Sequence, residues 1–188
     1  MDYPPRIYYL SLHLVGLTIG SIVLLAHLFA LLRTADSQKW LLRLPRSKTA
    51  GIVLLAIDAV WCFWLISTMD LEEFIWLKPY VQFAIPVLFF LTVIFVDELL
   101  AARALGIFAM LIAEPMISSA FLRPELSRLL LVLLAYVWLT FGMFWVGKPY
   151  LLRDQITWVT KSILRWRIAT GLGVLWGALI LGFALVVR

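Results

Sequence analysis

Two histidines and two glycines share one face of the first long apolar stretch, and their spacing could support chemistry. His13, Gly16, Gly20 and His27 fall within about 60° of one another when the stretch is wound as an α-helix. His13 and His27 are the only histidines in the chain. Polar side chains are costly at membrane depth and usually face protein or a cavity. The stripe therefore predicts a helix-packing face, a proton- or ion-handling site, or a cofactor site.

Two histidines fourteen residues apart on one helix, with glycines between them, are similar to the paired haem ligands of membrane b-type cytochromes. This resemblance implies that His13 and His27 could bind haem, with the glycines letting the macrocycle approach the backbone. Those cytochromes take the opposite ligands from a second helix, whereas this chain has no further histidine. A haem would therefore need a Met, a Lys or a second copy of the chain. A haem- or quinone-binding redox subunit is one alternative function.

Two carboxylic acids lie near the middle of predicted membrane spans. Asp58 is about eight residues into the second span, and Glu114, which Pro115 follows, is about ten residues into the fourth. Proline removes a backbone donor, and a carboxylate beside a loosened helix is the kind of feature found in carrier sites. His27 and Asp58 are expected at similar depths on consecutive helices, so they could contact each other. Asp58, Glu114 and His27 predict either a mutually satisfied polar pair or a proton- or ion-handling cluster.

Small residues form two further faces. Gly16 and Gly20 are four residues apart, and so are Gly173 and Gly177. Such spacing lets helices approach closely in lipid, so these four glycines predict helix packing. The single Cys62 excludes an intrachain disulfide and a cysteine-based metal site, and we expect no metal.

Composition sets the solvent of this protein. The chain has 188 residues, is 64% hydrophobic and has a mean hydropathy of +1.00. Soluble domains contain roughly 45–50% apolar residues, so the excess must face lipid. No segment is long or polar enough for a separate soluble domain, which predicts a single multipass membrane domain over residues 1–188. The net charge of +5 comes from basic residues beside the spans, so we expect no nucleic-acid partner.

Apolar runs long enough to cross about 30 Å of hydrocarbon define the expected spans. The predicted fold is an all-α integral membrane bundle of six helices at about 7–32, 51–69, 79–96, 104–122, 129–147 and 168–187. Residues 80–122 would make one helix of about 64 Å, so a turn is needed, with Asp97 as a candidate N-cap. The alternative is one tilted span followed by a re-entrant or interfacial helix, which gives five crossings.

Residues 152–166 differ from the spans. Leu152, Ile156, Val159, Ile163 and Trp166 recur at spacings of four and three, and charged residues occupy the other faces. This pattern predicts one amphipathic helix in the membrane interface. The basic segment between the first two spans, about 33–50, is expected to be a loop.

Lysine and arginine residues predict orientation. With six spans, the loops after the first, third and fifth spans contain eleven of them, and the other side contains five. The positive-inside rule then puts both termini on the non-cytoplasmic side. We expect an integral protein of a bacterial inner membrane.

The motifs of common enzyme classes, including G-x-S-x-G, H-E-x-x-H, P-loop and G-x-G-x-x-G sequences, do not occur in the chain. We therefore expect a non-enzymatic membrane subunit or assembly component that packs against other membrane chains or a second copy. The alternatives are a small proton- or ion-coupled carrier and the redox subunit described above.

Overall fold

The computed structural model describes residues 8, 10–96, 98–125 and 128–186. Over these residues the chain is helical and contains no strand, and six helices are long and apolar enough to cross a membrane. These are α1 (Leu12–Leu32), α3 (Lys48–Thr68), α4 (Lys78–Phe95), α5 (Leu100–Ala120), α6 (Arg128–Gly147) and α8 (Ile163–Val186). The predicted all-α membrane bundle is confirmed. Six of the described helices qualify as membrane spans by length and composition, and six crossings stays a prediction.

The turn between α4 and α5 brings the chain back in the space of a few residues. Asp97, the predicted N-cap, lies outside the described residues, and the N-cap of α5 is Leu99. Leu99 has a φ of 55°, a left-handed conformation that costs a non-glycine residue roughly 1–2 kcal/mol. The non-helical backbone of Val96 and the left-handed backbone of Leu99 both contribute to the reversal between α4 and α5.

The segment predicted as a basic loop is helical instead. It forms α2 (Thr34–Arg43) and the short 3₁₀ helix η1 (Leu44–Arg46), while a second 3₁₀ helix, η2 (Glu72–Leu77), precedes α4. Leu41 of α2 packs against a buried cluster that includes Leu152 and Ile156. Packing of one apolar face stabilises short helices that propensity alone would not.

The interfacial helix predicted at 152–166 is shorter and begins earlier. It is α7 (Tyr150–Thr160), and Trp166 belongs to α8. The carbonyl of Ser162 accepts the backbone hydrogen bond of Trp166 at 3.0 Å, as the residue before a helix does. The apolar spacing therefore continues across a break between two helices, which periodicity alone does not reveal.

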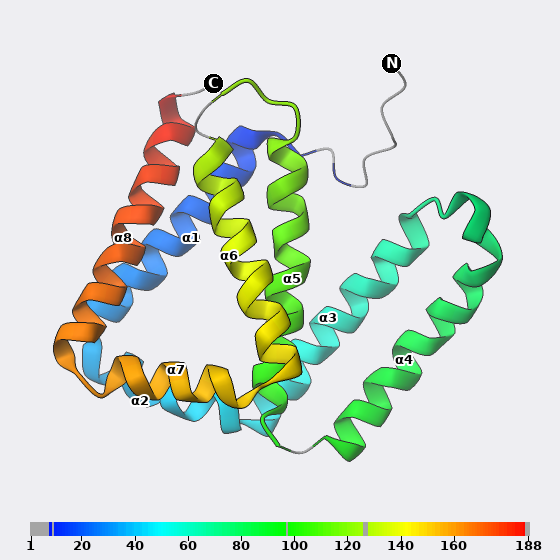
Figure 1. Ribbon diagram of the computed structural model, residues 1–188, viewed down its shortest axis with the longest axis horizontal. Helices are drawn as coiled ribbons and strands as arrows, with labels where there is room; N and C mark the ends of the chain where they lie inside the picture. The colour runs from blue at the N-terminus through cyan, green and yellow to red at the C-terminus, as the bar shows by residue number, and fades with distance from the viewer. Residues whose placement is uncertain (1–7, 9, 97, 126–127, 187–188) are drawn as a thin grey trace.

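The long helices form three pairs, and the short helices α2 and α7 form a base that runs from the α1–α8 pair to the α5–α6 pair (Figure 1). The helix α1 packs against α8, α5 against α6, and α3 against α4, and α3 also packs against α5. The base is formed by α2 and α7, which lie side by side at the end opposite the start of α1 and the end of α8. The largest buried cluster joins the first two pairs through residues such as Ile19, Met116, Ala135 and Ile180.

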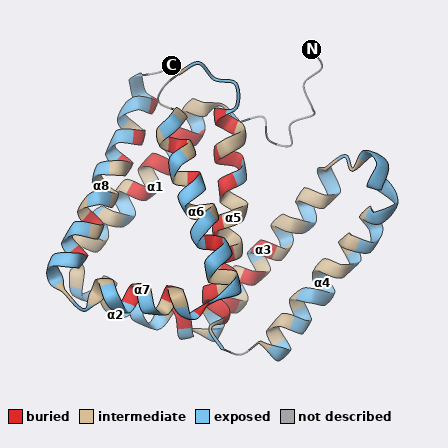
Figure 2. Ribbon diagram, viewed as in Figure 1, coloured by how far each residue is buried: buried red, intermediate tan, exposed pale blue. Residues whose placement is uncertain are grey.

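Burial is very unequal among the long helices (Figure 2). Eleven of the 21 residues of α5 are buried, whereas no residue of α4 is buried. The hairpin of α3 and α4 leans away from the other helices. The structure therefore has a packed centre at α5 and an exposed flank at α4, which packs on one side, mainly against α3.

Candidate functional site

The glycine face of α1 lies directly against α8. A β-carbon on Gly16 would lie 2.9 Å from Cβ of Ala184, and one on Gly20 would lie 2.8 Å from the backbone nitrogen of Leu181. From the other side, a β-carbon on Gly177 would lie 2.5 Å from the backbone nitrogen of Leu24. The two small-residue faces seen in the sequence thus contact each other across one interface.

His27 belongs to this interface as well. A β-carbon on Gly173 would overlap the imidazole ring of His27, and the Nδ1 atom of His27 lies 2.8 Å from the carbonyl oxygen of Val23. Asp58 is on α3, whereas the close neighbour of α1 is α8. The suggested contact between His27 and Asp58 is therefore absent among the described residues. The helix α1 packs mainly against α8, although α3 is nearer in the sequence, because the glycine faces of α1 and α8 fit closely together.

His13 lies at the other end of the α1–α8 interface. It lines a cavity of only about 20 Å³ together with Gly16, Leu131 and Phe183. A cavity of this size has room for about one water molecule. Between His13 and His27 the face of α1 is filled by α8, so a haem between these two histidines does not fit the packing.

Asp58 is the most deeply buried charged residue among those described. Its side chain is 1% exposed, and neither carboxylate oxygen has a hydrogen-bond partner in the described part of the chain. It lies on α3, which packs against α5, and Cys62 follows one turn later. An unpaired ionised carboxylate is costly in such a place, so we expect the neutral acid.

Several polar groups lie in the neighbourhood of Asp58. The indole Nε1 of Trp61 donates a hydrogen bond of 2.6 Å to the hydroxyl of Tyr8, which lies outside the spanning helices. Burial raises the pKa of Tyr8, the hydrogen bond from Trp61 lowers it, and the charges of Glu114 and Cys62 raise it. Glu114 itself is exposed on α5. The structure thus brings Asp58, Cys62, Tyr8 and Glu114 into one neighbourhood that excludes His27.

Further close contacts were not singled out from the sequence. Gly106 of α5 and Gly142 of α6 face each other, and a β-carbon on either would lie less than 3 Å from the carbonyl oxygen of the other. The guanidinium of Arg103 donates to the carbonyl of Val146 at 3.1 Å, which ties the start of α5 to the end of α6. The four-residue spacing of Ala102 and Gly106 is the signal that could have revealed this pairing.

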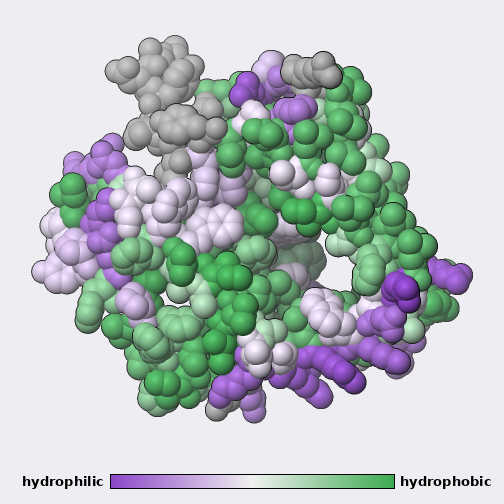
Figure 3. All heavy atoms as spheres, turned by 180° about the vertical axis from the view of Figure 1, so that it is seen from behind, coloured by the Kyte–Doolittle hydropathy of each residue, from purple (hydrophilic) through white to green (hydrophobic). Residues whose placement is uncertain are grey.

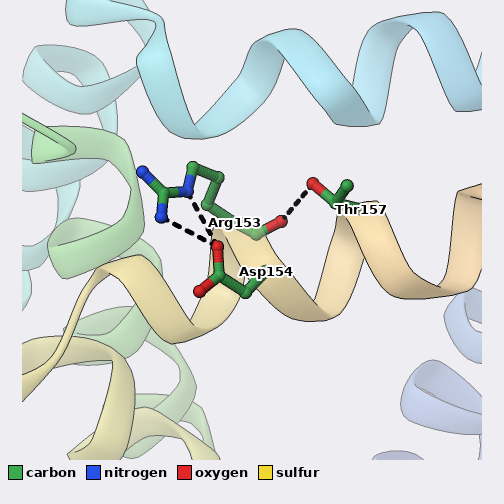
Figure 4. A network of polar contacts seen from close by, with 3 residues as sticks. All are labelled: Arg153, Asp154 and Thr157. Atoms are coloured by element: carbon green, nitrogen blue, oxygen red, sulfur yellow. Dashed lines mark hydrogen bonds and ion pairs between the residues drawn. The ribbon is translucent and has the colours of Figure 1, made fainter.

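One network of polar contacts at the base lies within α7 (Figure 4). Nε and Nη2 of Arg153 both lie 2.9 Å from Oδ1 of Asp154, and the hydroxyl of Thr157 donates to the carbonyl of Arg153 at 2.8 Å. Both charged side chains are exposed, and exposed ion pairs contribute roughly 0–1 kcal/mol. We infer that these contacts orient the surface of α7 rather than build a reactive site.

No known protein family, curated protein or solved structure matches this chain.

Proposed function

We propose that this protein is a non-enzymatic membrane subunit or assembly component that binds another membrane chain through α4. The single observation that carries the proposal is that α4, on the outer side of the α3–α4 hairpin, contains no buried residue. Its neighbours are α3 and η2. The other long helices each contain buried residues that contact a partner helix.

The surface offered by α4 suits a helical partner. Large apolar side chains are exposed along it, including Phe83, Phe90 and Phe95. A hollow of about 340 Å³ lies between α3 and α4, lined by Ala56, Ala59 and other apolar residues. Small residues let the backbone of a second helix approach closely, and packing is what drives helix association in lipid. The proposed occupant is a transmembrane helix of another chain.

A photo-crosslinking experiment tests this proposal. A photoreactive residue replaces Phe90, which is 62% exposed on α4, and in a control it replaces Leu172, which is 61% exposed on α8. We expect crosslinks to a protein chain from position 90 and only lipid adducts from position 172 in native membranes. Lipid adducts alone at both positions, with a monodisperse monomer after mild solubilisation, would contradict the proposal. Self-crosslinks at position 90 would identify the partner as a second copy.

A second candidate function is proton or ion handling by Asp58 and Glu114. The observation that favours it is a buried, unpaired carboxyl at Asp58, close to Cys62, with Tyr8 and Glu114 in the same neighbourhood. Ionisable groups inside membranes are often part of proton or ion pathways. In this version His27 has no part, because it packs on Gly173.

Proton flux into proteoliposomes tests the second candidate. Asp58→Asn and Glu114→Gln should each abolish most of the flux, because neither amide can release a proton at these pH values. His27→Gln should leave the flux unchanged and serves as the control. Full flux in Asp58→Asn between pH 5 and 8 would rule the mechanism out.

A further inference from the structure

A groove opens at the basic end of the molecule, where α1 and α8 meet α2 and α7. Its volume is about 700 Å³, within the ~300–1,000 Å³ typical of small-molecule sites. In the view of Figure 3 the molecule is hollowed just above a belt of hydrophilic side chains along its lower edge. The groove is separate from the α4 surface and from the polar groups near Asp58, because none of its lining residues belongs to α3, α4 or α5.

The walls of the groove are mainly apolar. Phe29 and Ala30 come from α1, Trp40 from α2, and Trp166 and Ala169 from α8. The indole Nε1 of Trp166 donates to the carbonyl of Ala30 at 3.2 Å, which fixes one wall. The two alanines leave room where larger side chains would close the groove. An apolar tail fits such walls, whereas a wholly polar ligand would be left unpaired.

The polar groups in the walls are few and mostly satisfied within the protein. The hydroxyl of Thr170 donates to the carbonyl of Trp166 at 2.8 Å, and Nδ1 of His27 lies against the carbonyl of Val23. The buried hydroxyl oxygen of Ser37 has no hydrogen-bond partner among the described residues. The walls therefore favour a ligand that is apolar along most of its length.

The segments that supply part of the groove wall are strongly basic. Residues 33–49 and 148–167, which contribute lining residues such as Trp40 and Trp166, contain ten Lys and Arg residues and only two acids. Arg33 lies 4.0 Å from Asp36 of the groove wall. Arg165 directly precedes Trp166, donates to the carbonyl of Trp158 and lies 4.5 Å above that indole ring. Basic pockets between membrane helices suit anionic lipid headgroups.

We propose that this groove binds one acyl chain of an anionic phospholipid, whose phosphate lies near Arg33 and Arg165. The lipid fills the space that α2 and α7 leave between themselves and the α1–α8 pair. The site does not depend on a partner at α4.

Native mass spectrometry of the delipidated full-length protein tests the site. The probes are phosphatidylglycerol and phosphatidylcholine with identical dioleoyl chains. We expect one phosphatidylglycerol per chain to be retained, about fivefold or more tightly than phosphatidylcholine, because one lipid headgroup is anionic and the other is not. Arg33→Gln and Arg165→Gln should each weaken phosphatidylglycerol binding by about fivefold. Arg123→Gln, at the opposite end of the molecule, should not change it.

A second pair of variants tests the apolar part. Ala26→Phe places a ring in the groove and should weaken the binding of both lipids severalfold. Ala178→Phe changes an alanine that is also exposed, on α8 outside the groove, and should leave binding unchanged. If Ala26→Phe fails to fold, the arginine variants still test the proposal.

Three results would overturn the proposal. They are equal retention of the two lipids, equal loss in the arginine variants and in Arg123→Gln, and stoichiometric recovery of a quinone or haem that competes with phosphatidylglycerol.

Discussion

At the level of single residues, the tightest steric relation involves the imidazole of His27 and the missing side chain of Gly173. The ring occupies the place that a β-carbon at position 173 would take. A residue larger than glycine at 173 is therefore incompatible with histidine at 27 in this conformation. The histidine therefore contributes to this interface as volume. Its hydrogen bond to Val23 satisfies one ring nitrogen on its own helix.

We predict that Gly173→Ala destabilises the protein by about 1–3 kcal/mol, because the added methyl group overpacks the interface. His27→Ala should largely rescue it, so the two changes should not be additive. Gly171→Ala is the control, since a β-carbon there meets nothing within 4 Å, and it should be neutral or slightly stabilising. Unfolding in mixed detergent micelles measures all four variants. Additive losses in the double variant would contradict this account.

Tyr8 provides a prediction about pH. Burial raises its pKa above 10.0, so the folded state favours the protonated hydroxyl. Its contribution to stability is therefore complete below about pH 10 and is lost as pH rises through the folded-state value. Between pH 9 and 11 the unfolding temperature of the wild type should fall more steeply than that of Tyr8→Phe. Parallel curves for the two proteins would refute this prediction.

Residue types alone were enough to select Asp58 and Glu114, because ionisable side chains are rare at membrane depth. The four glycines could be selected from their four-residue spacing, which is typical of helix packing in lipid. Neither signal could show that His27 would face Gly173, since those residues are far apart in the chain. The proximity of Tyr8 to Glu114 was also hidden, because it depends on where the chain before α1 lies relative to α5. Which of these residues contact each other depends on how the helices pack in the tertiary structure.

At the level of elements, α4 and α5 are the extremes of the bundle. About half of the residues of α5 are buried against its neighbours, and α4 has no buried residue. Elements with few buried contacts open locally at lower free-energy cost. In the isolated protein, hydrogen exchange in detergent should therefore be faster along α4 than along α5. Equal protection of the two helices would show that α4 is held by contacts other than those described here.

The long helices were predictable because an apolar run of that length has few other solutions in lipid. The short helices α2 and α7 were harder, because each is stabilised by its neighbours. Leu41 of α2 packs near Leu152 of α7, so neither helix can be judged from its own residues. For this reason the sequence predicts a loop where α2 forms, and it predicts a helix over 152–166 where α7 spans Tyr150–Thr160.

At the level of the whole molecule, the basic end formed by α2 and α7 predicts orientation. The positive-inside rule places this end in the cytoplasm and both termini on the other side. In a variant lacking Cys62, single cysteines at positions 40 and 154 should be labelled from the cytoplasmic side. Cysteines at positions 2, 123 and 188 should be labelled from the opposite side. Labelling of 40 and 188 from the same side would mean that six crossings is wrong.

The pairing of α1 with α8 has a consequence for biosynthesis. About 130 residues separate the end of α1 from the start of α8. At ~5–20 residues per second, the ribosome needs roughly 6 to 26 seconds to make that stretch. During this interval α1 is in the bilayer and Gly16 and Gly20 are not yet covered by α8. Because α8 is synthesised after the other seven α-helices described and covers the glycine face of α1, termination of synthesis before α8 would leave that face open to other membrane helices or to quality-control proteases.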